Sequence, residues 1–201
     1  MKDLFLNSIE FTSDLKPIKS GFKISFNKEI TVLVGNNGVG KSTILEALSD
    51  FFGFKDDTYL KRSRLKDNIS VSKKGDFPVK YIDFHGHDKK YAAAFGDNML
   101  LQLAQMKASS GQSSIALLNN AKFNDFGNGL ILLDEPCRSL SIKNQYNISR
   151  LIINLSKVKN CQVVLTSHSS IVLESLKDIA QFFSVESGED ISYKDYILSQ
   201  M

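Results

Sequence analysis

The chain has 201 residues, of which 42% are hydrophobic and 23% charged, and this size predicts one domain with a well-buried core. No apolar run approaches the roughly 20 residues that span a bilayer, and residues 1–7 are too polar for a signal peptide. The cysteines, Cys137 and Cys161, form no metal or disulfide pattern. We therefore expect a cytoplasmic protein without a transmembrane segment of its own.

The net charge of +3 is unevenly distributed. Between Lys61 and Lys90 there are nine basic and four acidic residues, so the rest of the chain is slightly acidic. A basic surface can bind nucleic acid or an acidic protein, or it can simply be solvated. The sequence leaves these alternatives open, and nucleic acid is a possible partner.

The first part of the chain is predicted to be β-structure. Alternating apolar runs predict short strands at Leu4–Phe11 and Phe22–Phe26. The continuous apolar run Ile30–Val34 predicts a buried strand, and a helix is expected from Lys41 to about Gly53.

The loop between that strand and helix is a candidate phosphate-binding site. Gly35, Gly40, Lys41 and Ser42 occupy the fixed positions of the pattern G-x-x-x-x-G-K-[ST]. Glycines allow successive N–H groups to converge on phosphate oxygens, and the helix N-terminus adds positive potential. Lys41 is placed to neutralise the β- and γ-phosphates, and Ser42 to bind Mg²⁺. The candidate ATP-binding residues are Asn36, Asn37, Gly38, Val39, Gly40, Lys41, Ser42 and Thr43.

Residues 55 to about 108 carry the weakest patterns. Alternation predicts a strand at Val79–Phe84, and spacing predicts a helix at Tyr91–Met106. His85 and His87 lie near Asp88, either as metal ligands or in a polar loop near the nucleotide. We favour the loop, because these groups without further ligands fall short of a metal site.

A small polar segment, Ala108–Ser114, precedes the predicted helix Ile115–Ala121. Its serines can cap that helix by accepting hydrogen bonds from free N–H groups. Alternatively, the helix N-terminus is a second anion site. The residues of that site would be Ser109, Ser110, Gly111 and Gln112.

Two carboxylates follow a continuous apolar run. Leu130–Leu133 has the composition of a central parallel strand covered on both faces, and Asp134 and Glu135 come directly after it. In open α/β folds, ligands bind at the carboxyl ends of such strands. Asp134 would orient Mg²⁺ and its water, and Glu135 would polarise the attacking water.

The last third predicts alternating helices and strands. A helix is expected at Ile142–Leu155 and a strand at Gln162–Leu165. His168 follows that strand, where it can contact a γ-phosphate or its water, or be structural. Ala180–Tyr193 is predicted to form a strand pair around Gly188.

The chain carries, in this order, GNNGVGKST, SSGQ, LILLDEP, SLS and LTSHSS. This order resembles ABC-type ATPase domains, and the match covers residues 22–52 and 108–178. Residues 109–169 resemble small stand-alone bacterial ATPases, often named AAA-type and not transporters, which read SSGES or SHGES, GLYLLDEPEAALSP and ATHSP. The resemblance implies an α/β P-loop NTPase with a mixed sheet, flanking helices and a small helical lobe. Its core lobe would comprise about 1–54 and 123–201, and its helical lobe about 55–122, within one domain over 1–201.

The resemblance also assigns roles. Lys41 would bind phosphate, Ser42 and Asp134 would ligate Mg²⁺, Glu135 would be the catalytic base and His168 the switch histidine. Ser109–Gln112 would be the signature that contacts the ATP of a partner, and Ser139–Ser141 the D-loop, in a head-to-tail homodimer that binds two ATP.

Three features depart from transporter ATPases. Ser110 stands where their signature has its first glycine, the arginine- and alanine-rich helix that follows is absent, and no Q-loop glutamine can be placed after Phe84. We therefore expect an ATPase that dimerises on ATP and switches a separate effector or nucleic-acid-processing system, with bacterial defence one candidate. The alternative is the ATP-binding subunit of a membrane transporter.

Two further classes are disfavoured. A repair or chromosome-organising ATPase would have sustained heptads for a long coiled coil, which the sequence lacks. A small-molecule kinase would not need an Asp-Glu pair together with a downstream histidine.

Overall fold

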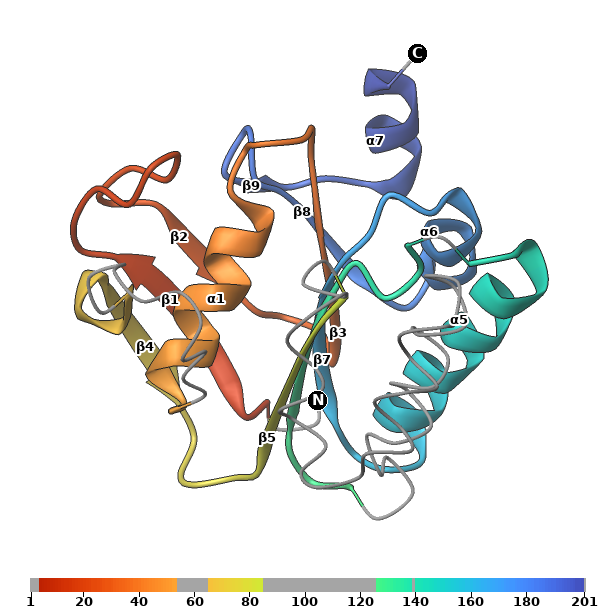
Figure 1. The fold of residues 1–201 in the computed structure, drawn as a ribbon, viewed down its shortest axis with the longest axis horizontal. Coiled ribbons are helices and arrows are strands. Elements are labelled where there is room, and N and C mark those ends of the chain that lie inside the picture. Colours follow the sequence, from red (N-terminus) through yellow and green to blue (C-terminus); the bar gives the residue numbers. More distant parts are fainter. Residues whose placement is uncertain (1–3, 54–64, 85–125, 139, 201) are drawn as a thin grey trace, which may run out of the picture.

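The computed structural model describes residues 4–53, 65–84, 126–138 and 140–200, which form two sheets with helices between and beside them (Figure 1). The smaller sheet is antiparallel, with strand order β2-β1-β4. Its strands are β1 (Leu6–Phe11), β2 (Lys23–Ser25) and β4 (Ile69–Lys73).

The larger sheet has six strands in the order β5-β6-β7-β3-β8-β9. They are β3 (Ile30–Val34), β5 (Val79–Asp83), β6 (Leu130–Asp134), β7 (Gln162–Thr166), β8 (Gln181–Ser184) and β9 (Glu189–Asp190). Neighbouring strands are parallel except for the last pair, in which β9 runs antiparallel to β8. The strand that precedes the phosphate loop, β3, therefore lies between two strands from the last third of the chain.

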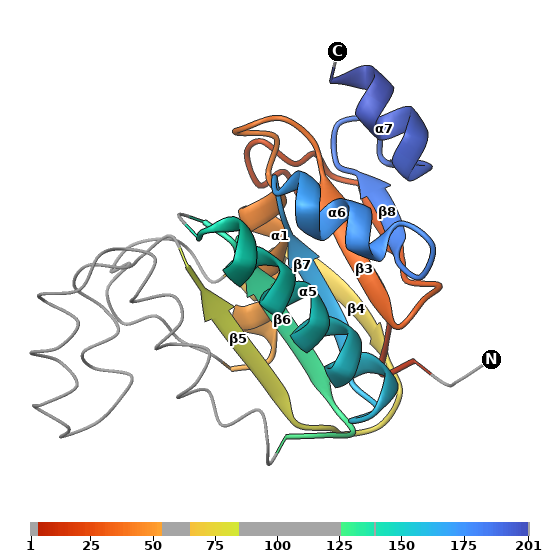
Figure 2. The ribbon, with the colours of Figure 1, turned by 90° about the vertical axis from the view of Figure 1, so that its right-hand side faces the viewer.

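Helices cover both faces of the larger sheet. The helices are α1 (Lys41–Phe51), α5 (Ile142–Lys157), α6 (Ser170–Leu176) and α7 (Tyr193–Ser199), with a 3₁₀ turn, η1, at Leu65–Asn68. Helix α1 lies between the two sheets (Figure 1). Helices α5 and α6 lie side by side on the opposite face (Figure 2). The described part of the chain is thus layered, with α1 enclosed between β-sheets.

Alternation along the central strands produces two cores. In β6, Ile131 and Leu133 pack toward α5 and α6, whereas Leu130 and Leu132 pack toward α1. Successive side chains of a strand point to opposite faces, so a strand covered on both sides must be apolar throughout. This explains why β3 and β6 are continuous apolar runs.

The expected strands and the helices after the phosphate loop and Asp134 are confirmed to within a few residues, as is the strand pair around Gly188. Helices α6 and α7 and strand β4 were not predicted. Helix α6 has only seven residues, too few for a clear apolar period.

Residues 65–84 depart from the predicted lobe boundaries. They were expected in the helical lobe at about 55–122, but β4 pairs with β1 and β5 pairs with β6. The physical reason is that Ile69 and Ile82 are buried in the two cores that flank the larger sheet. The rest of that lobe, with the helices expected at Tyr91–Met106 and Ile115–Ala121, lies outside the described residues.

A buried glutamine joins the two sheets. The Gln162 side chain, 1% exposed at the start of β7, accepts a hydrogen bond from the Leu6 N–H at 2.8 Å and donates one to the Leu6 carbonyl at 2.9 Å. The amide thereby pairs with a backbone in the way a neighbouring strand would. It satisfies two buried polar groups that water cannot reach.

Within the described residues, we find no helix both long enough and apolar enough to cross a membrane.

Replacing Gln162 by alanine should destabilise the domain without touching the phosphate loop. A buried group left unpaired costs about 1–3 kcal/mol, so loss of both Leu6 bonds should cost roughly 2–6 kcal/mol and lower Tm by roughly 4–24 °C. Differential scanning calorimetry measures this shift, with the exposed Gln200→Ala as the matched control. An unchanged Tm would mean that the inter-sheet bonds contribute nothing.

Candidate active site

Three central strands end at one edge of the larger sheet. Leu33 of β3 pairs with Thr166 of β7, and Leu133 of β6 pairs with Leu165. The segments that follow these strands are the phosphate loop, Asp134 with Glu135, and His168. Parallel pairing in this register therefore brings the phosphate loop together with the two carboxylates and with His168, which follows the loop by more than a hundred positions.

The phosphate loop has the backbone that its glycines allow. Gly35, Gly38 and Gly40 have φ values of 138°, 82° and 107°, a region that L side chains rarely adopt. A Cβ on Gly40 would lie 2.5 Å from Cδ1 of Ile18, which packs against the loop from the β1–β2 connection. Gly40 is thus required both by its backbone conformation and by close packing.

Lys41 points back into its own loop. Its ammonium is 2.8 Å from the carbonyl oxygens of Gly35 and of Asn36 and donates a hydrogen bond to each, while the residue is 6% exposed. Burial lowers the pKa of Lys41, and the carboxylates of Glu135, Asp134 and Glu186 act in the opposite direction. The loop therefore holds a positive charge at the base of the site.

The C-terminal part of the chain contacts the start of the loop. The Asn36 side-chain amide donates a hydrogen bond to Glu186 Oε1 at 2.7 Å, from the turn after β8. Burial raises the pKa of Tyr196 on α7, and a hydrogen bond with the backbone of Gly35 acts against that shift. Asn36 is therefore turned toward the C-terminal segment.

Thr166 joins the two carboxylate residues. Asp134 is 2% exposed, and its Oδ1 accepts a hydrogen bond from the Thr166 hydroxyl at 2.6 Å. The same hydroxyl oxygen accepts a bond from the Glu135 N–H at 2.8 Å. Glu135 has φ 49°, in the left-handed region that few non-glycine residues occupy, so the chain turns sharply after β6. This turn directs the Glu135 side chain toward His168.

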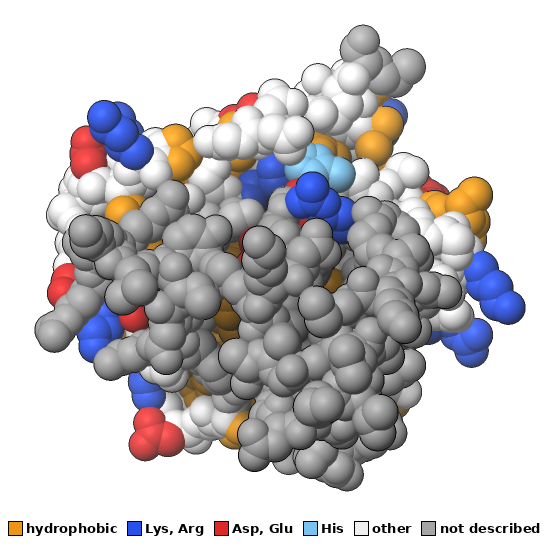
Figure 3. All heavy atoms as spheres, viewed as in Figure 1, with side chains coloured by type: hydrophobic (Ala, Val, Ile, Leu, Met, Phe, Trp, Pro, Cys, Tyr) orange, Lys and Arg blue, Asp and Glu red, His pale blue; other side chains and the backbone are white. Residues whose placement is uncertain are grey.

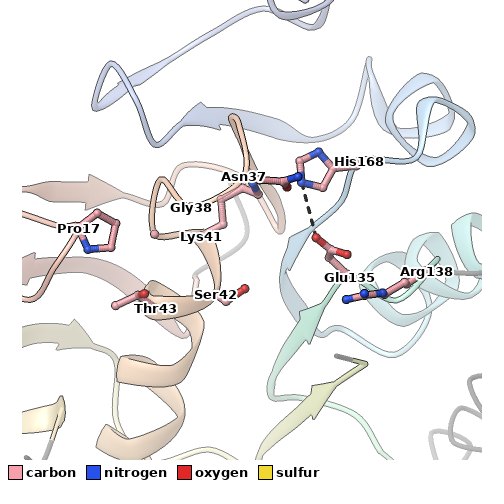
Figure 4. Close-up of a pocket in the computed structure, with 10 residues that line it drawn as sticks. Pro17, Asn37, Gly38, Lys41, Ser42, Thr43, Glu135, Arg138 and His168 are labelled. Atoms are coloured by element: carbon pink, nitrogen blue, oxygen red, sulfur yellow. Dashed lines mark ion pairs between the residues drawn. The ribbon is translucent and has the colours of Figure 1, made fainter. Parts of the chain in front are cut away.

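These segments enclose a pocket of about 600 Å³, within the range of small-molecule sites. It is lined by Pro17, Asn37, Gly38, Gly40, Lys41, Ser42, Thr43, Glu135, Arg138 and His168. Figure 4 shows the loop residues on one side and Glu135, Arg138 and His168 on the other. Glu135 Oε1 and His168 Nε2 are 3.6 Å apart, and their side chains are 19% and 39% exposed. Figure 3 shows histidine and basic side chains next to each other at the surface on this side.

The oxygen donors of the site fit Mg²⁺ that arrives with a nucleotide. Ser42 supplies a hydroxyl from the start of α1, and Asp134 supplies a buried carboxylate at the end of β6. Within the described ranges, no group of three or more His, Cys, Asp or Glu residues could hold a metal. Mg²⁺ needs no such cage, because one or two protein oxygens, phosphates and waters complete its octahedron.

Comparisons with known proteins find ATPase and ATP-binding proteins. A family model described as an AAA ATPase domain matches residues 13–100. An uncharacterized ABC transporter ATP-binding protein of Methanocaldococcus jannaschii is 24% identical over 82% of this chain and 76% of its own length. The zinc import ATP-binding protein ZnuC of Saccharophagus degradans is 23% identical over 81% of this chain and 69% of its own length.

Solved structures show the same fold. The ADP conformation of an ATP-binding cassette of an ABC transporter superposes with a TM-score of 0.58 at 18% identity, over 94% of this chain and 90% of that one. The chain has the fold of ABC-type ATPase domains and resembles ATP-binding proteins of that type in sequence. A model of ribosome-bound archaeal Pelota and ABCE1 gives a TM-score of 0.57 at 18% identity, over 100% of this chain and 37% of that one.

Most predicted site residues of this ATPase domain lie together. Of the candidate residues in the phosphate loop, Asn36 and Val39 do not line the pocket. Asp134 does not line the pocket either; it is buried, and its carboxylate accepts a hydrogen bond from Thr166. The signature Ser109–Gln112, the alternative site at His85 and His87, and Ser139 of the D-loop lie outside the described residues.

Three site residues were not anticipated from the sequence. Pro17 and Arg138 line the pocket, and Thr166 bonds to Asp134 and to Glu135. Arg138 could have been found as a cation three positions after Glu135. The signal for Thr166 was a hydroxyl at the end of a strand that leads to His168.

Gly40→Ala should weaken ATP binding. The left-handed backbone costs an alanine about 1–2 kcal/mol, and the contact with Ile18 adds to that cost, so we expect affinity to fall on the order of 5- to 30-fold or more. Isothermal titration calorimetry measures the change.

Gly75→Ala is the control, because Gly75 has φ 64° and no atom within 4 Å of an added Cβ. It should lower stability while ATP affinity stays at the wild-type value. Equal affinities for Gly40→Ala and wild type would show that the loop tolerates a side chain there.

Proposed function

We propose that this ATPase domain hydrolyses Mg²⁺–ATP as a head-to-tail homodimer and thereby switches a separate effector protein. The observation that carries the proposal is the convergence of Lys41, Glu135 and His168 on one pocket, from the ends of three parallel strands. Phosphoryl transfer needs positioned positive charge and an oriented nucleophile more than covalent chemistry. This pocket holds groups for both tasks.

The phosphate loop would bind the β- and γ-phosphates. Its glycine backbone presents N–H groups at the N-terminus of α1, where the helix dipole adds positive potential. Lys41 would exchange its bonds to two loop carbonyl oxygens for phosphate oxygens. Because the loop backbone is already in place, reorganisation on nucleotide binding would be confined largely to the Lys41 side chain.

Ser42 and Asp134 would hold Mg²⁺, which neutralises charge on the β- and γ-phosphate oxygens when bound. Asp134 is well suited to this task because its carboxylate is buried and already oriented by Thr166.

Glu135 would act as the general base toward the attacking water. Its carboxylate lines the pocket and faces His168 across 3.6 Å. A group at this position can accept the proton of a water placed against the γ-phosphate, and His168 would orient that water or contact the phosphate directly. The two side chains approach from neighbouring strands, β6 and β7, so their separation is set by the sheet.

The dimer would complete each site. Ser109, Ser110, Gly111 and Gln112 would contact the γ-phosphate bound by the partner copy, and Ser139–Ser141 would lie at the same interface. This role rests on the motif order GNNGVGKST, SSGQ, LILLDEP and LTSHSS. The remainder of the helical lobe expected at about 55–122 would present the signature.

A second candidate function is the ATP-binding subunit of a membrane transporter. It is favoured by the curated relatives, among them a zinc import ATP-binding protein and an ABC transporter ATP-binding protein. Ser110 in the signature and the lack of an assignable Q-loop glutamine favour the effector switch instead. A permease gene beside this one would support transport, whereas a nuclease or reverse-transcriptase gene would support the effector system.

Nucleic acid is a weaker candidate for the partner. Within the described residues of the basic stretch, the Lys73 ammonium pairs with Asp76 at 2.9 Å and lies 5.8 Å from the Phe77 ring centroid. Lys80 lies 5.1 Å from the Phe126 ring centroid. These lysines therefore have partners within the protein, which favours a protein-docking or solvated face.

Glu135→Gln should abolish most hydrolysis and leave ATP binding intact. The amide keeps the shape of the side chain but cannot accept a proton, and general-base catalysis contributes about 10²–10⁴-fold. Steady-state phosphate release and ATP affinity measure the two effects, with the exposed Glu189→Gln on β9 as the control. Full turnover by Glu135→Gln would place the base elsewhere, with His168 the next candidate.

Gly111→Asp should prevent ATP-dependent dimerisation. An aspartate there would bring a carboxylate against the partner's γ-phosphate, and like charges in a partly desolvated site repel strongly. The variant should still bind ATP through its own Lys41 and Ser42. Sedimentation of Gly111→Asp in the Glu135→Gln background, beside Glu135→Gln alone, tests this. A stable ATP-bound dimer of the double variant would show that the serine–glycine segment only caps a helix.

A further inference from the structure

We propose that Thr166 is a positioning residue that sets the carboxylate of Asp134 for Mg²⁺ and the backbone of Glu135 for catalysis. The inference deepens the proposed function and rests on it, because it concerns the same Mg²⁺ and the same base. Thr166 is not among the residues that line the pocket. It acts through the two residues with which it forms hydrogen bonds.

The Thr166 hydroxyl has a defined direction of hydrogen bonding. It accepts from the Glu135 N–H at 2.8 Å, so its own proton points to Asp134 Oδ1, 2.6 Å away. A bond from a hydroxyl to a carboxylate at this length belongs to the strong, charge-assisted class. One oxygen atom thus links the backbone of one carboxylate residue to the side chain of the other.

Water cannot replace this hydroxyl. Thr166 is 0% exposed and Asp134 is 2% exposed, at the ends of neighbouring buried strands. Removing the hydroxyl would take away one hydrogen bond from a buried carboxylate and the hydrogen bond that the Glu135 N–H donates to Thr166. The Asp134 carboxylate would then lose a restraint on rotation about its Cβ–Cγ bond.

The backbone geometry of Glu135 gives a function to the hydrogen bond between its N–H and the Thr166 hydroxyl. The residue has φ 49°, a conformation that costs a non-glycine side chain free energy and persists only when its surroundings hold it. With the chain leaving β6 at this point, the Glu135 N–H points to the Thr166 side chain. Thr166 therefore stabilises the turn that aims Glu135 into the pocket.

The position of Thr166 also couples these groups to the phosphate loop. Its backbone pairs with Leu33 of β3, two residues before Gly35. Thr166, at the end of β7, thus contacts the Asp134 carboxylate, the Glu135 backbone and the strand that leads into the phosphate loop. Groups that orient a metal ligand in this way typically affect metal affinity or activity 10–100-fold when they are removed.

The test compares Thr166→Val, which replaces the hydroxyl by a methyl group, with Thr166→Ser, which keeps the hydroxyl. Two quantities are measured: the Mg²⁺ concentration that half-saturates hydrolysis, and the gain in ATP affinity on replacing EDTA by Mg²⁺. Thr166→Val should raise the half-saturating Mg²⁺ concentration about 10–100-fold and reduce the gain in ATP affinity by a similar factor. Its ATP affinity in EDTA should stay unchanged. Thr166→Ser should behave like the wild type in both.

Thr31→Val is the matched control. Thr31 is also 0% exposed on the larger sheet, and its hydroxyl donates to Gln181 at 3.1 Å, away from the carboxylates. It should lower stability without changing the Mg²⁺ requirement. A merely structural role for Thr166 would give the same result for Thr166→Val as for Thr31→Val, and that outcome overturns the inference.

If Thr166→Val does not fold, Thr166→Cys provides a second test, because a thiol is similar in size but a weak donor. A raised Mg²⁺ requirement in Thr166→Cys supports the inference, and a wild-type requirement overturns it. Failure of the proposed function would look different: the wild-type protein would hydrolyse ATP without Mg²⁺, or the Glu135→Gln variant would keep full turnover.

Discussion

The parallel pairing of β3, β6 and β7 is the constraint on which the site depends. In this register Leu33 lies opposite Thr166 and Leu133 opposite Leu165, so the three strands end together. Side chains on both faces of these strands are buried, and a shift by one residue would move each apolar set to the wrong core. Packing of the cores therefore fixes, within the length of one residue, where the phosphate loop and the carboxylates meet.

Charge is kept in this buried edge only where it has partners. Lys41 donates to two carbonyl oxygens of its own loop, and Asp134 accepts from Thr166. A buried ion without partners would cost several kcal/mol, about as much as a domain of this size has to spare. The hydrogen bonds thus allow the fold to keep both a cation and a carboxylate buried at this edge of the sheet.

Much of this arrangement could be predicted from the sequence. Apolar runs located β3 and β6, the glycine pattern located the phosphate loop, and Asp134 with Glu135 followed a strand that had to be central. Each of these signals is local, because it lies within ten to fifteen consecutive residues. Strand β4 and helices α6 and α7 have weaker periods and are set by tertiary contacts, as in the pairing of β4 with β1.

Gln162 and Thr166 mark what local patterns cannot show. A glutamine or a threonine is common at strand ends, and nothing nearby indicates that Gln162 would hold Leu6 or that Thr166 would bond to Asp134. Their partners are 156 and 32 positions away in the chain. Such contacts follow from the order of the strands in the sheet, which local patterns in a single sequence do not reveal.

The strand order also dictates when the nucleotide site can be completed as the chain is synthesised. The phosphate loop belongs to the first quarter of the chain, but its strand β3 lies between β7 and β8, and its loop contacts Glu186 and Tyr196. Contacts of such long sequence separation form late, because the intervening chain must be made and closed first. For most of translation the apolar residues Ile30–Val34 therefore lack the two strands, β7 and β8, with which they pair in the folded domain.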